Sequence, residues 1–463
     1  MSKAAMHSFE LGRAKSSTPT IDKCAIVPIV ACAYATVVGP LLNFASFLPG
    51  ELNTFVSTIR SGEPGVSGRI FWPVMATVSV VLAARYHFRL SRLTLALHVI
   101  CLLAYVALAG SSVLWAFKPE ISFIRFVQQV MVITSIVLPA MLAVRTVDLM
   151  RGVFLCFALG ALLNIFVVEF GTPLLHENGY AGYFLGKNYL GEFAAAAFLL
   201  ALYETFYPGL RRALGIVIVI ISALLLFLSN SKTALGLAFL SPLLAGLTLI
   251  IRKITRISPA IILLAIPFCY AILSSVSHYN MDLLSYKLYG DSTFTGRTAI
   301  WDFANYEIER RPLLGWGYQG FWLVGLDAPS VVDAPGWVKL MPNAHNGYYD
   351  TMLETGYVGL ALFLIFIIAT LHAIGRVADR NPARALLVLS LALFVIIYNF
   401  LESFWMRGVE FLWVLFLILV AEIARYWQPF ALTKAAYRPR SAGPGSSGPP
   451  RGTRMPRPGI RLS

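Results

Sequence analysis

The chain has 463 residues, of which 58% are hydrophobic and 13% are charged, and its mean hydropathy is +0.72. A soluble globular protein carries about 25% charged residues, so this composition excludes an ordinary soluble domain. The formal net charge of +14 would suggest a nucleic-acid partner in a soluble protein. Here its meaning depends on where the charges lie relative to a membrane.

Twelve apolar runs are each about long enough to cross the hydrocarbon core of a bilayer, and they predict an all-α polytopic membrane protein with about 12 transmembrane helices. The first run is too long for the apolar part of a signal peptide, and no clear cleavage site follows it, so we expect an uncleaved span. The runs are residues 24–47, 70–84, 93–116, 121–144, 150–169, 189–206, 213–229, 233–251, 257–276, 355–374, 385–401 and 409–426.

Lys and Arg collect in the cytoplasmic loops of membrane proteins and thereby indicate orientation. With the N-terminus inside, 25 of the 37 basic residues and 6 of the 23 acids fall on the inner side, for a net charge of +19. The outer side holds 12 basic residues and 17 acids, for a net charge of −5. Every short inner loop is basic, which favours twelve helices with both ends of the chain in the cytoplasm.

This topology divides the chain into five segments. They are a cytoplasmic N-terminal tail (1–23), helices one to nine (24–276), a long outer loop (277–354), helices ten to twelve (355–426) and a cytoplasmic tail (427–463). The last tail is basic and rich in Pro, Gly and Ser, so we expect it to be disordered. All five cysteines lie in or at the edge of apolar runs, which indicates neither a disulfide framework nor a thiolate metal site.

The outer loop is rich in aromatic residues, so it is expected to fold. Residues 296–311 read as an amphipathic helix, with Ile300, Trp301, Ala304 and Ile308 on one face and a proline after its end. The GxGxxG string at residues 315–320 lacks the strand and βαβ unit of a dinucleotide site. Its glycines are better explained by tight packing of an aromatic-rich turn.

Ionisable side chains at membrane depth are costly, so a group of them needs partners, a wet cavity or a function. Several gather at the outer boundary of the predicted spans. Each has a plain structural explanation: the lysines can reach the headgroups, and a histidine can cap a helix. Arg297 differs because it opens a helix, where the helix dipole favours acids. The group comprises Arg125, Lys187, Asn188, Lys232, Arg297, His345, Asn346, Asp350 and Glu354.

Together these residues suit one kind of chemistry. Fixed cations bind a pyrophosphate, and one imidazole can remove a hydroxyl proton. Glycosyl transfer from a lipid pyrophosphate needs both functions. Arg and Lys can stabilise the departing pyrophosphate, so we expect no metal and no other cofactor.

At these residues the chain resembles the superfamily of O-antigen ligases and O-antigen polymerases, which are bacterial membrane glycosyltransferases. The resemblance covers roughly residues 180–375 and is carried by GYFLGKNYLG (182–191), SNSKTAL (229–235), GRTAIW (296–301), RPLLGWG (311–317) and HNGYYDTMLETGYVG (345–359). The last is the most specific, since the family shows H-N-x-Y followed by E-x-G before a span.

The resemblance implies an architecture, a location and substrates. The fold would be similar to GT-C glycosyltransferases, and the protein would lie in the bacterial inner membrane with its active site on the periplasmic face. The donor would be a polyprenyl-pyrophosphate-linked glycan and the acceptor a glycan or lipid A core, with other polysaccharide export proteins as further partners and no nucleic acid.

Residue matching carries two catalytic roles onto this chain. The arginine of the GRT segment is Arg297, which would engage the pyrophosphate, and the loop histidine is His345, which would assist deprotonation. Substrate-binding roles are predicted for Lys187, Asn188, Lys232, Arg125, Asn346, Asp350 and Glu354. Many ligases have an arginine where this chain has Lys232, and lysine keeps the charge without the bidentate fork.

The Ser-Lys-Thr turn and the Lys-Asn pair lean toward the exopolysaccharide polymerase branch, similar to ExoQ. The predicted function is therefore polymerisation of exopolysaccharide repeat units, with O-antigen ligation, as in lipopolysaccharide biosynthesis, as the alternative. A lipid-linked glycan flippase is the alternative of another class. Transporters place polar residues near the midplane in repeated halves, whereas here the charges gather at one face and no internal repeat is visible.

Overall fold

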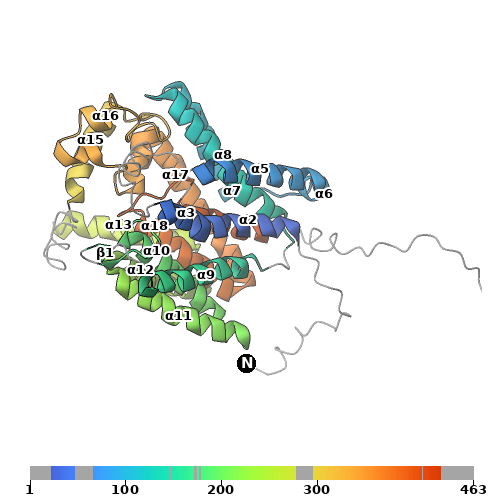
Figure 1. Cartoon of the computed structure of the whole chain (residues 1–463). Helices are drawn as coiled ribbons and strands as arrows, with labels where there is room; N and C mark the ends of the chain where they lie inside the picture. Colours follow the sequence, from blue (N-terminus) through green and yellow to red (C-terminus); the bar gives the residue numbers. More distant parts are fainter. Residues whose placement is uncertain are drawn as a thin grey trace, which may run out of the picture.

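The computed structural model describes residues 22–46, 66–144, 148–170, 175–176, 179–277, 296–408 and 410–428. The described part is a bundle of helices with one two-stranded antiparallel pair (Figure 1). The longer helices are α2 (Lys23–Ala33), α3 (Gly39–Ser46), α5 (Val66–Arg85), α7 (Leu97–Ser111), α8 (Pro119–Leu142), α9 (Leu149–Phe170), α10 (Lys187–Glu204), α11 (Leu210–Ser229), α12 (Lys232–Thr255), α13 (Pro259–Ser277), α15 (Arg297–Arg310), α17 (Gly347–Arg380), α18 (Pro382–Tyr398) and α19 (Phe411–Ala424).

The remaining elements are short. A π-helical turn, η1 (Tyr34–Val38), joins α2 to α3, and the other helical pieces are α6 (His87–Leu90), η2 (Ser112–Leu114), α16 (Pro329–Val332), η3 (Gly336–Leu340) and η4 (Arg425–Trp427). Strands β1 (Leu175–His176) and β2 (Gly179–Tyr180) pair just before α10.

Each of the twelve predicted apolar runs coincides with one of these helices or with a helix and its adjoining turn. By length and apolarity, eight described helices can cross a membrane, and two shorter apolar helices span Pro259–Ser275 and Pro382–Tyr398. The prediction of an all-α polytopic membrane protein is therefore confirmed. The count of twelve spans, their orientation and the domain boundaries stay predictions, and the two tails lie almost entirely outside the described residues.

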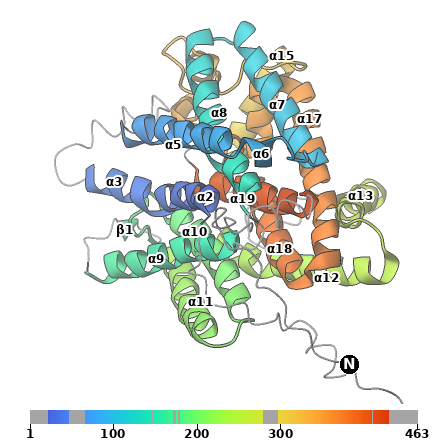
Figure 2. The same ribbon diagram turned by 90° about the vertical axis from the view of Figure 1, so that its right-hand side faces the viewer.

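Helix α19 forms the centre of the bundle, where Figure 2 shows it surrounded by other helices. All 14 of its residues are buried, and its sequence FLWVLFLILVAEIA is apolar on nearly every face. A helix that is apolar all round belongs in an interior, whereas a helix with one apolar stripe belongs at a surface. Glu422 is the exception, and it is paired with Arg425 one turn later at 2.6 Å.

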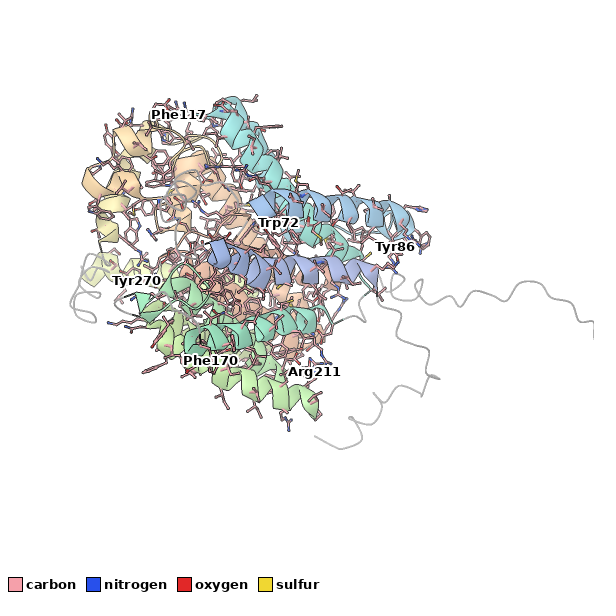
Figure 3. All side chains as sticks on the ribbon, viewed as in Figure 1. Trp72, Tyr86, Phe117, Phe170, Arg211 and Tyr270 are labelled. Atoms are coloured by element: carbon pink, nitrogen blue, oxygen red, sulfur yellow. The ribbon has the colours of Figure 1, made fainter. Side chains whose placement is uncertain are left out.

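That ion pair belongs to a network at the end of the bundle predicted to face the cytoplasm. Arg384 at the start of α18 contacts Asp148 at 2.6 Å, and Arg211 at the start of α11 contacts Glu204 at 2.6 Å and Asp148 at 3.4 Å. Figure 3 shows Arg211 at one end of the bundle and Phe117 near the other. The network joins the ends of α9, α10, α11, α18 and α19.

At the opposite end, residues 296–346 form a cap with its own apolar core. Helix α15 buries one face through Ile300, Phe303, Ala304 and Ile308. The periodicity predicted three of these, and Trp301, the fourth residue that it predicted, is partly buried. These side chains pack with Trp316, Phe321, Trp322, Val338 and Leu353. Burial of each large side chain in such a core stabilises it by about 1.5–3 kcal/mol, so this part of the outer loop is an ordered unit.

The cap is held to the bundle by a break in α17. Gly356 has φ +66° and ψ −168° inside that helix, which frees backbone groups on both sides of it. The RPLLGWG segment satisfies them: Trp316 N donates to Leu353 O at 2.8 Å, Gly317 N donates to Glu354 O at 2.9 Å, and Tyr357 N donates to Pro312 O at 2.7 Å. The break matches the sequence, which places the start of a span at residue 355.

The glycines of the GxGxxG string allow this close approach. A Cβ on Gly315 would come within 2.6 Å of Leu353 O, and one on Gly317 within 2.3 Å of the Ala116 Cβ. Both residues also have positive φ, at +66° and +100°. The interpretation of this string as a tightly packed turn fits its structure, and no strand precedes it in the described part of the loop.

We expect Gly356→Ala to destabilise the protein strongly. The added Cβ would lie 2.2 Å from the carbonyl of Leu313, and the left-handed backbone adds strain, for a total of about 2–4 kcal/mol. Gly246→Ala in α12 is the control because nothing lies within 4 Å of its new Cβ. Thermal unfolding in detergent measures both, and equal melting temperatures for the two variants would contradict this account.

Glu307 should make the cap sensitive to pH. Burial raises the pKa of this carboxyl above its ordinary value, while Arg310 acts in the opposite direction. A carboxyl whose pKa is higher in the folded state than in the unfolded chain favours folding while it is protonated. The free energy of unfolding therefore falls as the pH rises from about 4.3, where the carboxyl of the unfolded chain ionises. The melting temperature of the wild type, relative to that of Glu307→Gln, should therefore increase as the pH is lowered from 8 to 4.5. Asp302→Asn, on the exposed side of α15, should show no such trend.

Candidate active site

The centre of the candidate site is the carboxylate of Glu402, in the turn between α18 and α19. Its Oε1 accepts from Arg297 Nη2 at 2.8 Å and from Asn188 Nδ2 at 3.2 Å, and its Oε2 lies 3.0 Å from His345 Nδ1. The side chains of Arg297, His345 and Glu402 are 18%, 31% and 14% exposed. One carboxylate thus joins α10, α15, the loop before α17 and the α18–α19 turn.

His345, whose ring contacts this carboxylate, has a left-handed backbone conformation. Its φ is +46°, which is unusual for a residue with a side chain. Its N–H donates to Asn343 Oδ1 at 2.9 Å, which closes the turn. A strained residue that its surroundings hold in place is a feature of functional sites.

The two residues after His345 fix where α17 begins. Asn346 caps the helix, because its Oδ1 accepts from Tyr348 N at 3.0 Å and from Tyr349 N at 3.3 Å. Gly347 N donates to Asn399 O and Glu402 O, and a Cβ on Gly347 would meet Asn399 Oδ1 at 2.4 Å. The His-Asn-Gly sequence is therefore required locally, and it locks the histidine loop against the turn that carries Glu402.

Three basic residues open helices at this end of the bundle. Lys187, Lys232 and Arg297 are the first residues of α10, α12 and α15. A helix start carries partial positive charge, so the helix dipole does not stabilise a cation there. The dipole and the cation together favour the binding of an anion. The first turns of α10 and α12 lie in contact, since a Cβ on Gly191 would be 2.6 Å from the Ser231 Cβ.

A second charged group lies behind the histidine loop, around Arg407. Arg407 contacts Asp350 at 2.9 Å and Glu354 at 4.0 Å. Asp350 also accepts from Trp322 Nε1 at 2.8 Å and from Ala344 N at 3.0 Å. Asp350 therefore holds the backbone of the residue before His345, and its carboxylate is fully occupied.

Arg125 belongs to this second group. It donates to the backbone carbonyl of Gln319 and lines a small cavity of about 40 Å³ with Gln319, Trp322, Leu323, Pro342, Glu354 and Arg407. A space of this size holds water molecules rather than a sugar ring. Arg125 and Glu354 thus line this cavity together with Arg407.

The structure brings the predicted residues Asn188, Arg297 and His345 together, places Lys187 and Lys232 at neighbouring helix starts, and gives Asn346 and Asp350 supporting contacts. The sequence prediction omitted Glu402 and Arg407. A signal for them was present, because the short outer connection between the last two predicted spans, residues 402–408, holds one acid and one arginine, which are charges at a membrane boundary.

Within the described ranges, no three His, Cys, Asp or Glu side chains gather so as to hold a metal ion. The chemical capacity of the Glu402 group is that of a base and a set of cations. With Oε2 as acceptor, His345 Nδ1 carries the proton and Nε2 is left to accept one. The arginine and the two helix-start lysines can bind phosphate oxygens.

Comparison with known proteins identifies the same segment. A family model described as O-antigen ligase (Wzy_C) matches residues 217–364. The exopolysaccharide production protein ExoQ of Rhizobium meliloti is 26% identical over 303 residues, which are 60% of this chain and 66% of that protein. Putative polysaccharide ligases of Rickettsia bellii and Rickettsia prowazekii are 28% and 29% identical over 127 and 130 residues, about a quarter of this chain.

The fold thus defines a polytopic membrane protein, and the similarity to O-antigen ligases seen in the motifs is confirmed over residues 217–364. The chain covers just under two thirds of ExoQ and about a third of the Rickettsia proteins. The matched family segment contains Lys232, Arg297, His345, Asp350 and Glu354. Asn188 and Glu402 lie outside it.

Replacing Glu402 tests its place at the centre of the site. Glu402→Gln should lower stability by about 1–3 kcal/mol, because Arg297 loses a partly buried partner. Glu402→Ala should cost at least as much. Glu309→Gln, an exposed acid in α15, is the matched control. Unfolding in detergent at low and high salt measures the loss, and an unchanged midpoint for both Glu402 variants would show that the carboxylate does not join these elements.

Proposed function

We propose that the protein is a membrane glycosyltransferase that transfers a glycan from a polyprenyl-pyrophosphate carrier at the periplasmic face. The observation that carries the proposal is the pairing of one histidine with Glu402 beside three helix starts that each begin with a cation. A base and an anion-binding site side by side are the two parts that this reaction needs.

In the proposed reaction the acceptor hydroxyl attacks the anomeric carbon of the donor sugar. The carbon–oxygen bond to the pyrophosphate breaks, a new glycosidic bond forms, and the polyprenyl pyrophosphate leaves with the bonding electrons. The hydroxyl proton passes to Nε2 of His345, while Glu402 stabilises the resulting imidazolium through Nδ1. Arg297, Lys232 and Lys187 stabilise the charge on the leaving group.

The remaining predicted residues take supporting parts in this proposal. Asn188 orients Glu402, Asn346 fixes the start of α17, and Asp350 holds the histidine loop through Ala344. Arg125, Glu354 and Arg407 keep the cap seated behind that loop. Their direct contact with substrate is not needed for the mechanism.

Polymerisation of exopolysaccharide repeat units is the form of transfer that we favour. ExoQ matches over a longer part of this chain than the polysaccharide ligases do, 303 residues against about 130. The family model and the ligase names support ligation of O-antigen to lipid A core as the second candidate. Both reactions would use the same donor chemistry.

Alanine at His345 or Arg297 tests the proposal in the producing strain. We expect transfer to fall by about 10²–10⁴-fold for His345→Ala, the size of a lost general base. Lys232→Ala should reduce transfer, while Lys253→Ala, at the far end of the same helix, serves as the control. Lipid-linked repeats and extracellular polysaccharide are followed in membranes and medium.

The distribution of products separates the candidate functions. Accumulation of lipid-linked repeats in the periplasmic leaflet with loss of long polysaccharide supports polymerisation. Loss only of glycan on lipid A core selects the ligase. Repeats that never reach the periplasmic leaflet would contradict the transferase and indicate a flippase.

A further inference from the structure

One tryptophan of the cap differs from all the others. All nine tryptophans lie in the described residues, and Trp337 is the only one that is largely exposed, with 49% of its surface accessible. Four neighbouring indoles, those of Trp115, Trp301, Trp316 and Trp322, each donate Nε1–H to a protein oxygen. In the described structure Trp337 makes no such bond, so its N–H and its ring face are open to a ligand.

The backbone that carries the exposed ring is held in place. Trp337 lies in η3, where Val338 N donates to Pro335 O at 3.0 Å and Met341 N donates to Val338 O at 3.0 Å. The next side chain, Val338, is 1% exposed and packs in the core of the cap. The buried Val338 side chain and the hydrogen bonds of the backbone fix this turn, so the indole extends from an ordered part of the cap.

The position of the ring relates it to the candidate active site. A Cβ built on Gly296 would lie 3.8 Å from Cζ2 and 3.9 Å from Cη2 of Trp337. Gly296 directly precedes Arg297, whose guanidinium contacts Glu402. The edge of the indole therefore lies next to the residue that precedes Arg297, the cation that would bind the donor pyrophosphate.

We propose that Trp337 is a saccharide-binding platform, on which a sugar ring of the lipid-linked glycan stacks while Arg297 holds its pyrophosphate. A pyranose has an apolar face of C–H groups that packs on an indole, and its hydroxyls can accept from the free Nε1–H. This inference rests on the proposed function, because it assigns the place of the glycan in that same site. The ligand class is a hexose-containing oligosaccharide.

The test measures saccharide binding without turnover. The full chain carrying His345→Ala is placed in lipid nanodiscs, and the probe is the oligosaccharide released by mild acid from the producing strain's lipid-linked precursor. Adding Trp337→Ala should weaken its binding about tenfold. Trp337→Phe should recover part of the loss, since it keeps a ring and lacks the N–H. Leu326→Ala, at a residue of the cap that is 91% exposed, is the control.

Each outcome decides for or against the platform. Weaker binding in Trp337→Ala, partly recovered in Trp337→Phe and unchanged in Leu326→Ala, supports it, whereas equal binding in all variants overturns it. A lower membrane yield with unchanged oligosaccharide binding would make Trp337 a lipid anchor and would likewise overturn it. If binding depends on Trp337 while the wild type transfers no glycan, the platform stands and the proposed reaction fails.

Discussion

The break in α17 is the constraint on which the outer half of the molecule depends. A helix interrupted at Gly356 exposes backbone groups that have to be satisfied, and residues 312–317 satisfy them from a segment far away in sequence. The same contact seats the cap on the bundle and fixes the first turns of α17. His345, Asn346 and Gly347 take their positions from that helix start, so the geometry of the candidate site follows from this backbone interlock.

The Glu402 carboxylate then binds three side chains that the packing of these elements brings close together. Its three partners come from α10, the start of α15 and the histidine loop, and none of these elements is next to another in sequence. A partly buried carboxylate shared by an arginine, an imidazole and an amide is well satisfied. Because the three groups share one acceptor, the position of the carboxylate depends on all of them.

The sequence predicted the helices and most of the site because these follow from local patterns. Apolar runs identify the long helices of the bundle, and the spacing of Ile300, Ala304 and Ile308 identifies α15. His345 and Arg297 were found through short motifs. The contacts of Glu402 and Arg407 depend on which helices pack together, and packing in a membrane bundle leaves little trace in a single sequence. The break at Gly356 was visible only as a boundary between polar and apolar residues.

The ion pairs at the predicted cytoplasmic end anchor the two helices whose connection carries Glu402. Arg384 and Glu422 lie in the terminal turns of α18 and α19, and these two helices carry Glu402 in the connection at their other end. A helix of the length of α18 is a stiff rod of about 26 Å. The distance between Glu402 and these salt bridges is therefore set by the length of the two helices, and the candidate site is held at a constant height above that end of the bundle.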